Sequence, residues 1–209
     1  MDRVSLSSAD IEKLLAWRDE HKDEVRTYPT PLKAVEIVCK ESGYTIKGIR
    51  NGEILKLYLG RNGRNLGHIE FTRMSDGMML QKKNRMEASA DEVQSVLTVY
   101  CSLMALMASS PVMESSKERD DIEHHVTSPK KPHKSKSNRT TYIIRMENGR
   151  ILAAPRGAHA SPKGTFSVRG HYRHYKSGKV VWIAEYKKGT GQKKRKNYKL
   201  GGEKNGEAV

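Results

Sequence analysis

The feature that most constrains this chain is a long stretch without a charged residue, from Val93 to Met113. Its densest apolar part runs only from Val96 to Met107, and the rest is largely polar. Dense apolar runs of about 10–14 residues are more often core helices than membrane spans. The stretch therefore predicts a buried helix, which needs a sheet or other helices to cover it, and no contact with a membrane.

The segment before this helix has the pattern of an antiparallel meander. Alternating polar and apolar residues, separated by turn sequences, predict four strands at about 44–50, 54–59, 66–73 and 78–82. Asn51-Gly52 is a strong signal for a two-residue hairpin turn. Ser89-Ala90-Asp91-Glu92 is a capping box, so we expect the buried helix to begin directly after Ser89.

Two helices are expected ahead of the meander. The first begins at Ser7 or Ser8, with Asp10 in its first turn, where an acidic side chain suits the helix dipole. The second is predicted from Thr30, an N-cap followed by proline at the first helical position, to a C-cap at Gly43. Its apolar positions at helical spacing are Leu32, Val35, Val38 and Cys39.

The formal net charge of +15 lies almost entirely in one half of the chain. Residues 1–110 carry 16 Lys and Arg against 15 Asp and Glu, whereas residues 111–209 carry 23 against 9. The sequence predicts an α+β protein: N-terminal helices, a four-stranded antiparallel meander and a buried helix over 1–110, then a small basic β-rich domain over 140–190. Between them, 111–139 is polar and of low complexity and predicts a flexible linker, and 191–209 predicts a disordered basic tail.

Cysteine content and the N-terminus indicate the compartment. The two cysteines, Cys39 and Cys101, lie in apolar stretches and offer neither a disulfide framework nor a Cys-based zinc site. The first residues contain no apolar core of a secretory signal. We therefore expect a cytoplasmic protein, with self-association through the N-terminal domain left open.

Residues 165–188 carry the most informative chemistry. Two β-strands flank the compact turn at Ser177-Gly178, and alternation places His171, Arg173 and Tyr175 on the face opposite Tyr172 and His174. Tyr and Trp rings can stack on bases while Lys and Arg neutralise phosphates, so we expect DNA or RNA as the partner. The candidate nucleic-acid-binding residues are Arg156, Lys163, Arg169, His171, Tyr172, Arg173, His174, Tyr175, Lys176, Lys179, Trp182, Tyr186, Lys187 and Lys188.

The same residues also admit a purely structural interpretation. Tyr172, Trp182 and Tyr186 could form the core of a small domain short of aliphatic residues, and the basic runs could be solvated tails. Between Pro129 and Gly202, however, 20 Lys and Arg face only two acids, and such one-sided charge favours a polyanion partner over solubility alone.

A catalytic role is the weaker interpretation. His171, Tyr172, Arg173 and His174 could serve a metal-independent nuclease, but any basic binding hairpin carries such residues. No P-loop, Rossmann or catalytic-triad pattern occurs, and a metal site lacks nearby carboxylates and thiolates, so neither cofactor nor metal is predicted. A rival of another class is an inhibitor or adaptor that binds a host nucleoprotein complex, such as a defence nuclease.

The segment around Arg169-Gly170-His171-Tyr172-Arg173 and Gly178-Lys179 resembles a C-terminal motif of small basic proteins from phages and mobile elements of Firmicutes. Those proteins end in an Arg-Gly-His-aromatic-Arg hairpin, a Gly-Lys turn and an apolar strand with Trp. This chain departs from the motif with Val168 in place of a second Arg and Tyr172 in place of Trp. The resemblance covers about a sixth of the chain and implies a phage or prophage setting, and with it the cytoplasm of a bacterial host cell, but no mechanism.

Overall fold

The computed structural model describes residues 1–27, 30–109, 113–117, 140–145, 164–191 and 195–201. Within these ranges the chain forms helices α1–α3 and strands β1–β13. In chain order they are β1 (Asp2–Leu6), α1 (Ser8–Glu20), α2 (Lys22–Thr27), β2 (Ala34–Cys39), β3 (Tyr44–Asn51), β4 (Ile54–Arg61), β5 (Arg64–Arg73), β6 (Met79–Met86), α3 (Ala90–Ser109), β7 (Met113–Lys117), β8 (Thr140–Arg145), β9 (Phe166–Val168), β10 (His171–His174), β11 (Val180–Ile183), β12 (Tyr186–Lys188) and β13 (Asn197–Gly201).

A nine-stranded mixed sheet organises the fold, in the order β6-β5-β4-β3-β2-β1-β13-β8-β7. Strands β3 to β6 form the predicted antiparallel meander, and β2 pairs antiparallel with β3. Strand β1 lies parallel to both β2 and β13, and β13 lies parallel to β8. The protein is therefore mixed α+β, as predicted, but strands from both ends of the chain share one sheet.

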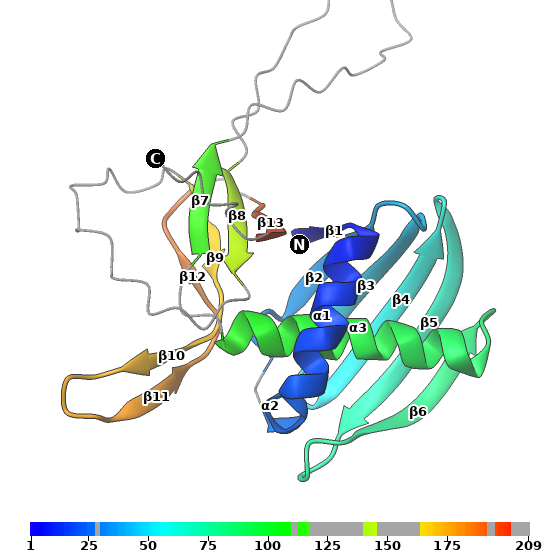
Figure 1. Cartoon of the computed structure of the whole chain (residues 1–209), viewed down its shortest axis with the longest axis horizontal. Coiled ribbons are helices and arrows are strands. Elements are labelled where there is room, and N and C mark those ends of the chain that lie inside the picture. The colour runs from blue at the N-terminus through cyan, green and yellow to red at the C-terminus, as the bar shows by residue number, and fades with distance from the viewer. Residues whose placement is uncertain (28–29, 110–112, 118–139, 146–163, 192–194, 202–209) are drawn as a thin grey trace, which may run out of the picture.

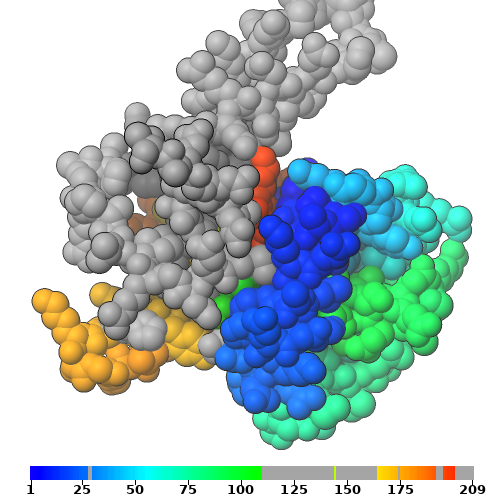
Figure 2. Space-filling view, in the orientation of Figure 1, coloured from blue at the N-terminus to red at the C-terminus, as the bar shows by residue number. Residues whose placement is uncertain are grey.

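The three helices lie on one face of the β1–β6 part of the sheet, with α1 crossing over α3 (Figure 1). Helix α3 is the one described helix long and apolar enough to cross a membrane, yet 56% of its apolar stretch is buried inside the fold. In the space-filling view, α1 and α2 cover part of α3 (Figure 2). This arrangement confirms the predicted buried helix, because α3 has the sheet below it and α1 above it.

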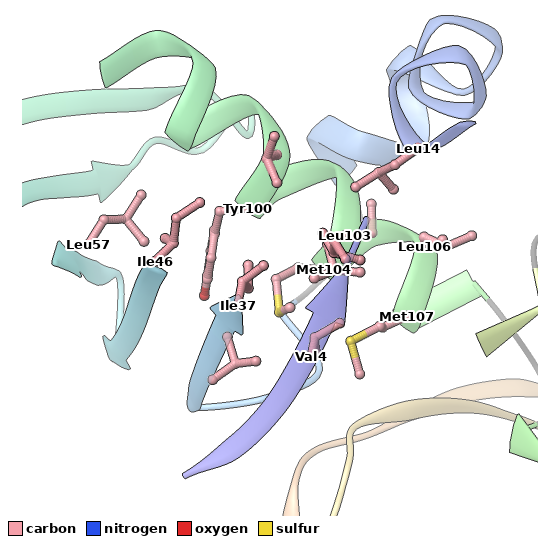
Figure 3. Close-up of a cluster of buried hydrophobic side chains, with 14 of the residues drawn as sticks. Val4, Leu14, Ile37, Ile46, Leu57, Tyr100, Leu103, Met104, Leu106 and Met107 are labelled. Carbon is pink, nitrogen blue, oxygen red and sulfur yellow. The ribbon is translucent and has the colours of Figure 1, made fainter. Parts of the chain in front are cut away.

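The core fills the space between α3 and the sheet (Figure 3). Leu103 and Met107 of α3 are fully buried, as are Val4 of β1 and Ile37 of β2. Burying one such side chain contributes roughly 1.5–3 kcal/mol to stability. Because residues of β1 and α3 belong to the same core, their burial joins the N-terminal strand to the helix that follows the meander.

Capping boxes begin two of the helices; the sequence predicts the one at Ser89, and for the first helix only a start at Ser7 or Ser8. At α1 the Asp10 N–H donates to Ser7 Oγ (3.1 Å) and Asp10 Oδ2 accepts from the Ser7 N–H (2.8 Å). At α3 Ser89 and Glu92 make the same reciprocal pair, at 3.2 and 2.9 Å. Glu92 also accepts a hydrogen bond from the Tyr44 hydroxyl (2.9 Å), which ties the start of α3 to β3.

The helix predicted from Thr30 to Gly43 is wrong, because the centre of this segment is strand β2 and no helix forms in it. Val35, Ile37 and Cys39 are buried at every second position, which is the period of a strand. The same apolar residues also fit helical spacing. The tertiary structure decides for the strand, since β2 lies between β1 and β3 with neighbours on both edges.

Strand β1 and helix α2 were not predicted, and β13 lies in the segment expected to be a disordered tail. Tyr198 and Leu200 of β13 are buried against the same core as Val4. Strand β7 likewise falls inside the range expected to be a linker. Short segments with only two or three inward-facing positions carry too little periodicity to be recognised without their partners.

Candidate nucleic-acid interface

The predicted C-terminal hairpin is one antiparallel ribbon interrupted near its middle. Strands β9 and β12 pair at its base, β10 and β11 pair at its tip, and both pairs keep the same register. At the interruption the Gly170 N–H donates to the Pro31 carbonyl (2.7 Å), and Glu185 Oε2 accepts from the Lys33 N–H (2.5 Å). Where the pairing between its strands stops, the ribbon is therefore bonded to the segment that precedes β2, through one backbone amide and one side-chain carboxylate.

Tyr172 and Trp182 form a cross-strand pair at this point. Their ring centroids lie 4.9 Å apart in an edge-to-face arrangement, and both side chains are partly buried. A Cβ on Gly170 would lie 2.5 Å from Cζ2 of Trp182, so the indole packs directly over the glycine. These two rings are engaged within the ribbon, in keeping with the packing role that the sequence left open for them.

The tip of the ribbon projects from the body of the molecule (Figures 1 and 2). Its turn is closed by the Tyr175 N–H, which donates to the Lys179 carbonyl (2.9 Å), and Gly178 adopts a φ of 79° there. Arg173, Lys176 and Lys179 are exposed, and so is Tyr175 at 43%. The Arg173 guanidinium lies 5.1 Å from the centroid of the Tyr175 ring. An aromatic face and three cations are therefore displayed together in solvent.

A second exposed group lies at the base of the ribbon. Tyr186, Lys187 and Lys188 of β12 are all exposed. Lys196, which sequence analysis did not single out, places its ammonium nitrogen 4.9 Å from the centroid of the Phe166 ring. Tip and base together present cations along the ribbon, while its described acid, Glu185, is engaged with the Lys33 amide.

Several candidate residues are not displayed in this way. Arg169 is partly buried, and burial lowers its pKa. His171 is also partly buried, with Nδ1 3.0 Å from the Arg169 carbonyl oxygen, a distance suited to Nδ1–H donation. The side chain of His174 and the residues Arg156 and Lys163 lie outside the described part of the chain.

The residues suggested for a nuclease do not converge. Tyr172 pairs with Trp182 on one face of the ribbon, whereas His171 and Arg173 pair with Ile183 and Val181 on the other. Within the described ranges, no group of three or more His, Cys, Asp or Glu side chains could hold a metal ion. Within the described ribbon, Tyr172 therefore lies on the face opposite His171 and Arg173.

A small cavity lies below α3, at the far ends of β3 and β5. It is lined by Arg50, Arg73 and Tyr100, among mostly apolar neighbours. Arg50 donates to Thr30 Oγ1 (2.5 Å) and to the Gly52 carbonyl (2.7 Å), and Arg73 donates to the Arg26 carbonyl. Arg50 therefore joins the loop at Thr30 to β3, and Arg73 joins helix α2 to β5, structural roles that their isolated positions in the sequence did not reveal.

Comparison with protein-family models, with curated proteins and with solved structures finds no match for this chain.

Proposed function

We propose that the protein binds nucleic acid through the exposed side of its C-terminal ribbon. The observation that carries this proposal is the tip, where Arg173 lies against the exposed Tyr175 ring and Lys176 and Lys179 are exposed in the adjoining turn. Glu185 does not neutralise this cluster, because it lies beyond the end of β11 that is far from the tip. Its carboxylate accepts a hydrogen bond from the Lys33 amide there. The cations contact phosphates, and Tyr175 packs on a sugar or a base.

The proposed contacts are a smaller set than the sequence-based candidates. Trp182 packs on Tyr172 and over Gly170, and Arg169 is partly buried. We therefore assign the ligand contacts to the exposed residues Arg173, Tyr175, Lys176, Lys179, Lys187 and Lys188. The resemblance of the ribbon sequence to phage and mobile-element proteins bears on the setting alone; the ligand is inferred from the exposed cations and Tyr175.

The test compares the full chain with a triple variant, Arg173→Ala, Lys176→Ala and Lys179→Ala, in binding to labelled DNA and RNA across a salt series. Each lost phosphate contact reduces the log–log salt slope by about 0.9 for duplex DNA and about 0.7 for single strands. Because the triple variant loses three contacts, we expect its log–log salt slope to fall by about two to three.

The matched control removes three exposed lysines elsewhere, in the variant Lys13→Ala, Lys22→Ala and Lys40→Ala. Net charge falls equally in both variants. If the control loses as much affinity and slope as the tip variant, the attraction is diffuse and the ribbon is not the interface. If the wild-type chain binds no nucleic acid, the charge serves a protein partner such as a host nucleoprotein complex.

A further inference from the structure

The nine-stranded sheet has two unlike faces. The helices cover one of them, toward which Ile46, Gly48 and Leu57 point. No described helix covers the opposite face of β1–β6, which we call the outer face. Alternation along the strands assigns to it the side chains that lie between buried positions, such as Lys47 on β3 and Lys56 and Tyr58 on β4.

Six outer-face side chains form a row across the sheet, because each is the register partner of the next. From β1 to β6 the row reads Arg3, Glu36, Lys47, Tyr58, His68 and Arg85. Neighbouring strands lie about 4.8 Å apart, so the row is roughly 24 Å long. That length accommodates several nucleotides of an extended strand.

An aromatic pair lies near the centre of the row. The rings of Tyr58 and His68 have centroids 5.3 Å apart and are tilted by 33°, and both side chains are partly exposed. Bases of a single strand stack on aromatic side chains displayed by a flat sheet, because every base has a π-face. Bases inside a duplex are stacked on each other and have no free face. The aromatic pair of Tyr58 and His68 therefore favours single-stranded ligands.

Positive charge surrounds the aromatic pair. The outer-face positions of β1–β6 and β13 carry six cations and two acids, Glu36 and Glu70; the cations are Arg3, Lys47, Lys56, Lys83, Arg85 and Lys199.

Both acids are already engaged. Glu36 Oε2 lies 2.7 Å from Arg3, and Glu36 Oε1 lies 3.7 Å from Lys47. Glu70 Oε1 lies 2.9 Å from Lys56. Although burial acts to raise the pKa of Glu36, its hydrogen bond from Arg3 and the charges of Arg3 and Lys47 outweigh burial and lower it. The net field of the outer face is therefore positive, and it attracts a polyanion.

Protection of a sheet edge and dimerisation each account for less of this pattern. Lysines on an edge strand prevent it from pairing with another sheet, which would explain Lys83 on β6 but not the row through the central strands. Exposed Ile54 and Leu80 could mark a dimer contact, but a second copy would bring an equally positive face against this one. Charge complementarity thus selects a polyanion as the occupant.

We infer that the outer face of β1–β6 binds single-stranded nucleic acid. Bases stack on Tyr58 and His68, and phosphates contact Arg3, Lys47, Lys83 and Arg85. This inference rests on the proposed nucleic-acid-binding function for its ligand, but it uses a different surface and adds the preference for single strands.

The experiment measures binding of the full chain to labelled dT20, rU20 and a 20-base-pair duplex. Tyr58→Ala removes a stacking platform and is expected to weaken binding of dT20 or rU20 about tenfold, within the 1–3 kcal/mol range for one base. Tyr58→Phe keeps the ring and should bind as wild type. Whichever of dT20 and rU20 binds more tightly assigns the ligand to DNA or RNA.

Tyr58 lies in a central strand, where its replacement by alanine can also weaken the fold. A second variant therefore changes residues on an edge strand instead. Lys83→Ala with Arg85→Ala changes only exposed side chains of the edge strand β6 and should weaken binding of single strands and reduce the salt slope. Photo-crosslinking of 5-iodouridine-labelled strands to the wild-type chain, followed by peptide mapping, should place adducts within 54–73.

Three results would overturn the inference: unchanged dT20 and rU20 binding in both outer-face variants, equal losses for single strands and duplex, or crosslinks confined to 164–191. The tip variant described above separates the two surfaces. Loss of binding in the tip variant with unchanged binding in the outer-face variants supports the ribbon alone, and the reverse supports the outer face alone.

Discussion

Gly48 of β3 lies directly beneath the ring of Tyr100 of α3. A Cβ built on Gly48 would be 2.2 Å from Cε2 of Tyr100, closer than any real contact allows. The absence of a side chain on one strand therefore permits a large aromatic residue on the helix to reach the sheet. The relationship sets how closely α3 approaches the sheet whose opposite side is the outer face.

Replacing Gly48 with alanine should destabilise the fold. Tyr100 is fully buried and cannot move away without disturbing its neighbours, so we expect Gly48→Ala to cost about 1–3 kcal/mol, the usual range for overpacking. Urea unfolding measures this. In a Tyr100→Ala background the same change should cost clearly less, and equal costs in both backgrounds would show that the two residues do not meet.

The buried ring of Tyr100 stabilises the fold, whereas its hydroxyl group destabilises it. It is buried and has no hydrogen-bond partner among the described residues. Leaving such a group unsatisfied costs about 1–3 kcal/mol, so Tyr100→Phe should raise the midpoint of thermal unfolding.

Tyr44→Phe is the matched control for this change. It removes a hydroxyl that donates to Glu92 at 2.9 Å and should lower the midpoint. A decrease in both variants would mean that the Tyr100 hydroxyl is satisfied in solution.

Asp2 predicts a pH dependence of stability. Its side chain is 5% exposed, and burial raises its pKa, an effect that the hydrogen bond from the Lys196 amide (3.2 Å) and the Lys196 charge only partly offset. The folded state therefore binds this proton more tightly than the unfolded chain does. Its contribution to stability is lost as pH rises from the unfolded pKa near 3.8 through the higher folded value.

Asp2→Asn keeps the acceptor oxygen and removes the titration. We expect the variant to be more stable than wild type at pH 7 and to lose that advantage at pH 3, where both side chains are neutral. The free energy of unfolding in urea at the two pH values provides the check. If Asp2→Asn were more stable than wild type by the same amount at pH 3 and pH 7, titration of Asp2 could not be the cause of the difference.

The attachment of the ribbon to the sheet can be tested at Gly170. Gly170→Ala would bring a methyl group within 2.5 Å of the Trp182 ring and disturb the bond to Pro31. We expect amide hydrogen exchange across 171–183 to accelerate roughly tenfold while β3–β5 keep their protection, since ribbon and sheet open separately. Ser177→Ala, in the exposed turn, should leave exchange unchanged, and faster exchange throughout β3–β5 would contradict separate opening.

Local signals in the sequence determined much of this fold. The meander, the turn at Asn51-Gly52, the start of the first helix at Ser7 or Ser8, the capping box at Ser89 and the alternation along the C-terminal ribbon were all predicted, because each depends on residues close together in the chain.

Only the tertiary structure decided the rest. The apolar residues of β2 fit a helix as well as a strand until β1 and β3 pair with it, and parallel pairing of β1 with β13 has no turn sequence to announce it. Which aromatic rings of the ribbon face solvent was settled by packing over Gly170, not by residue type. Contacts between distant segments leave no periodic mark on either one, so they emerge only when the chain is folded.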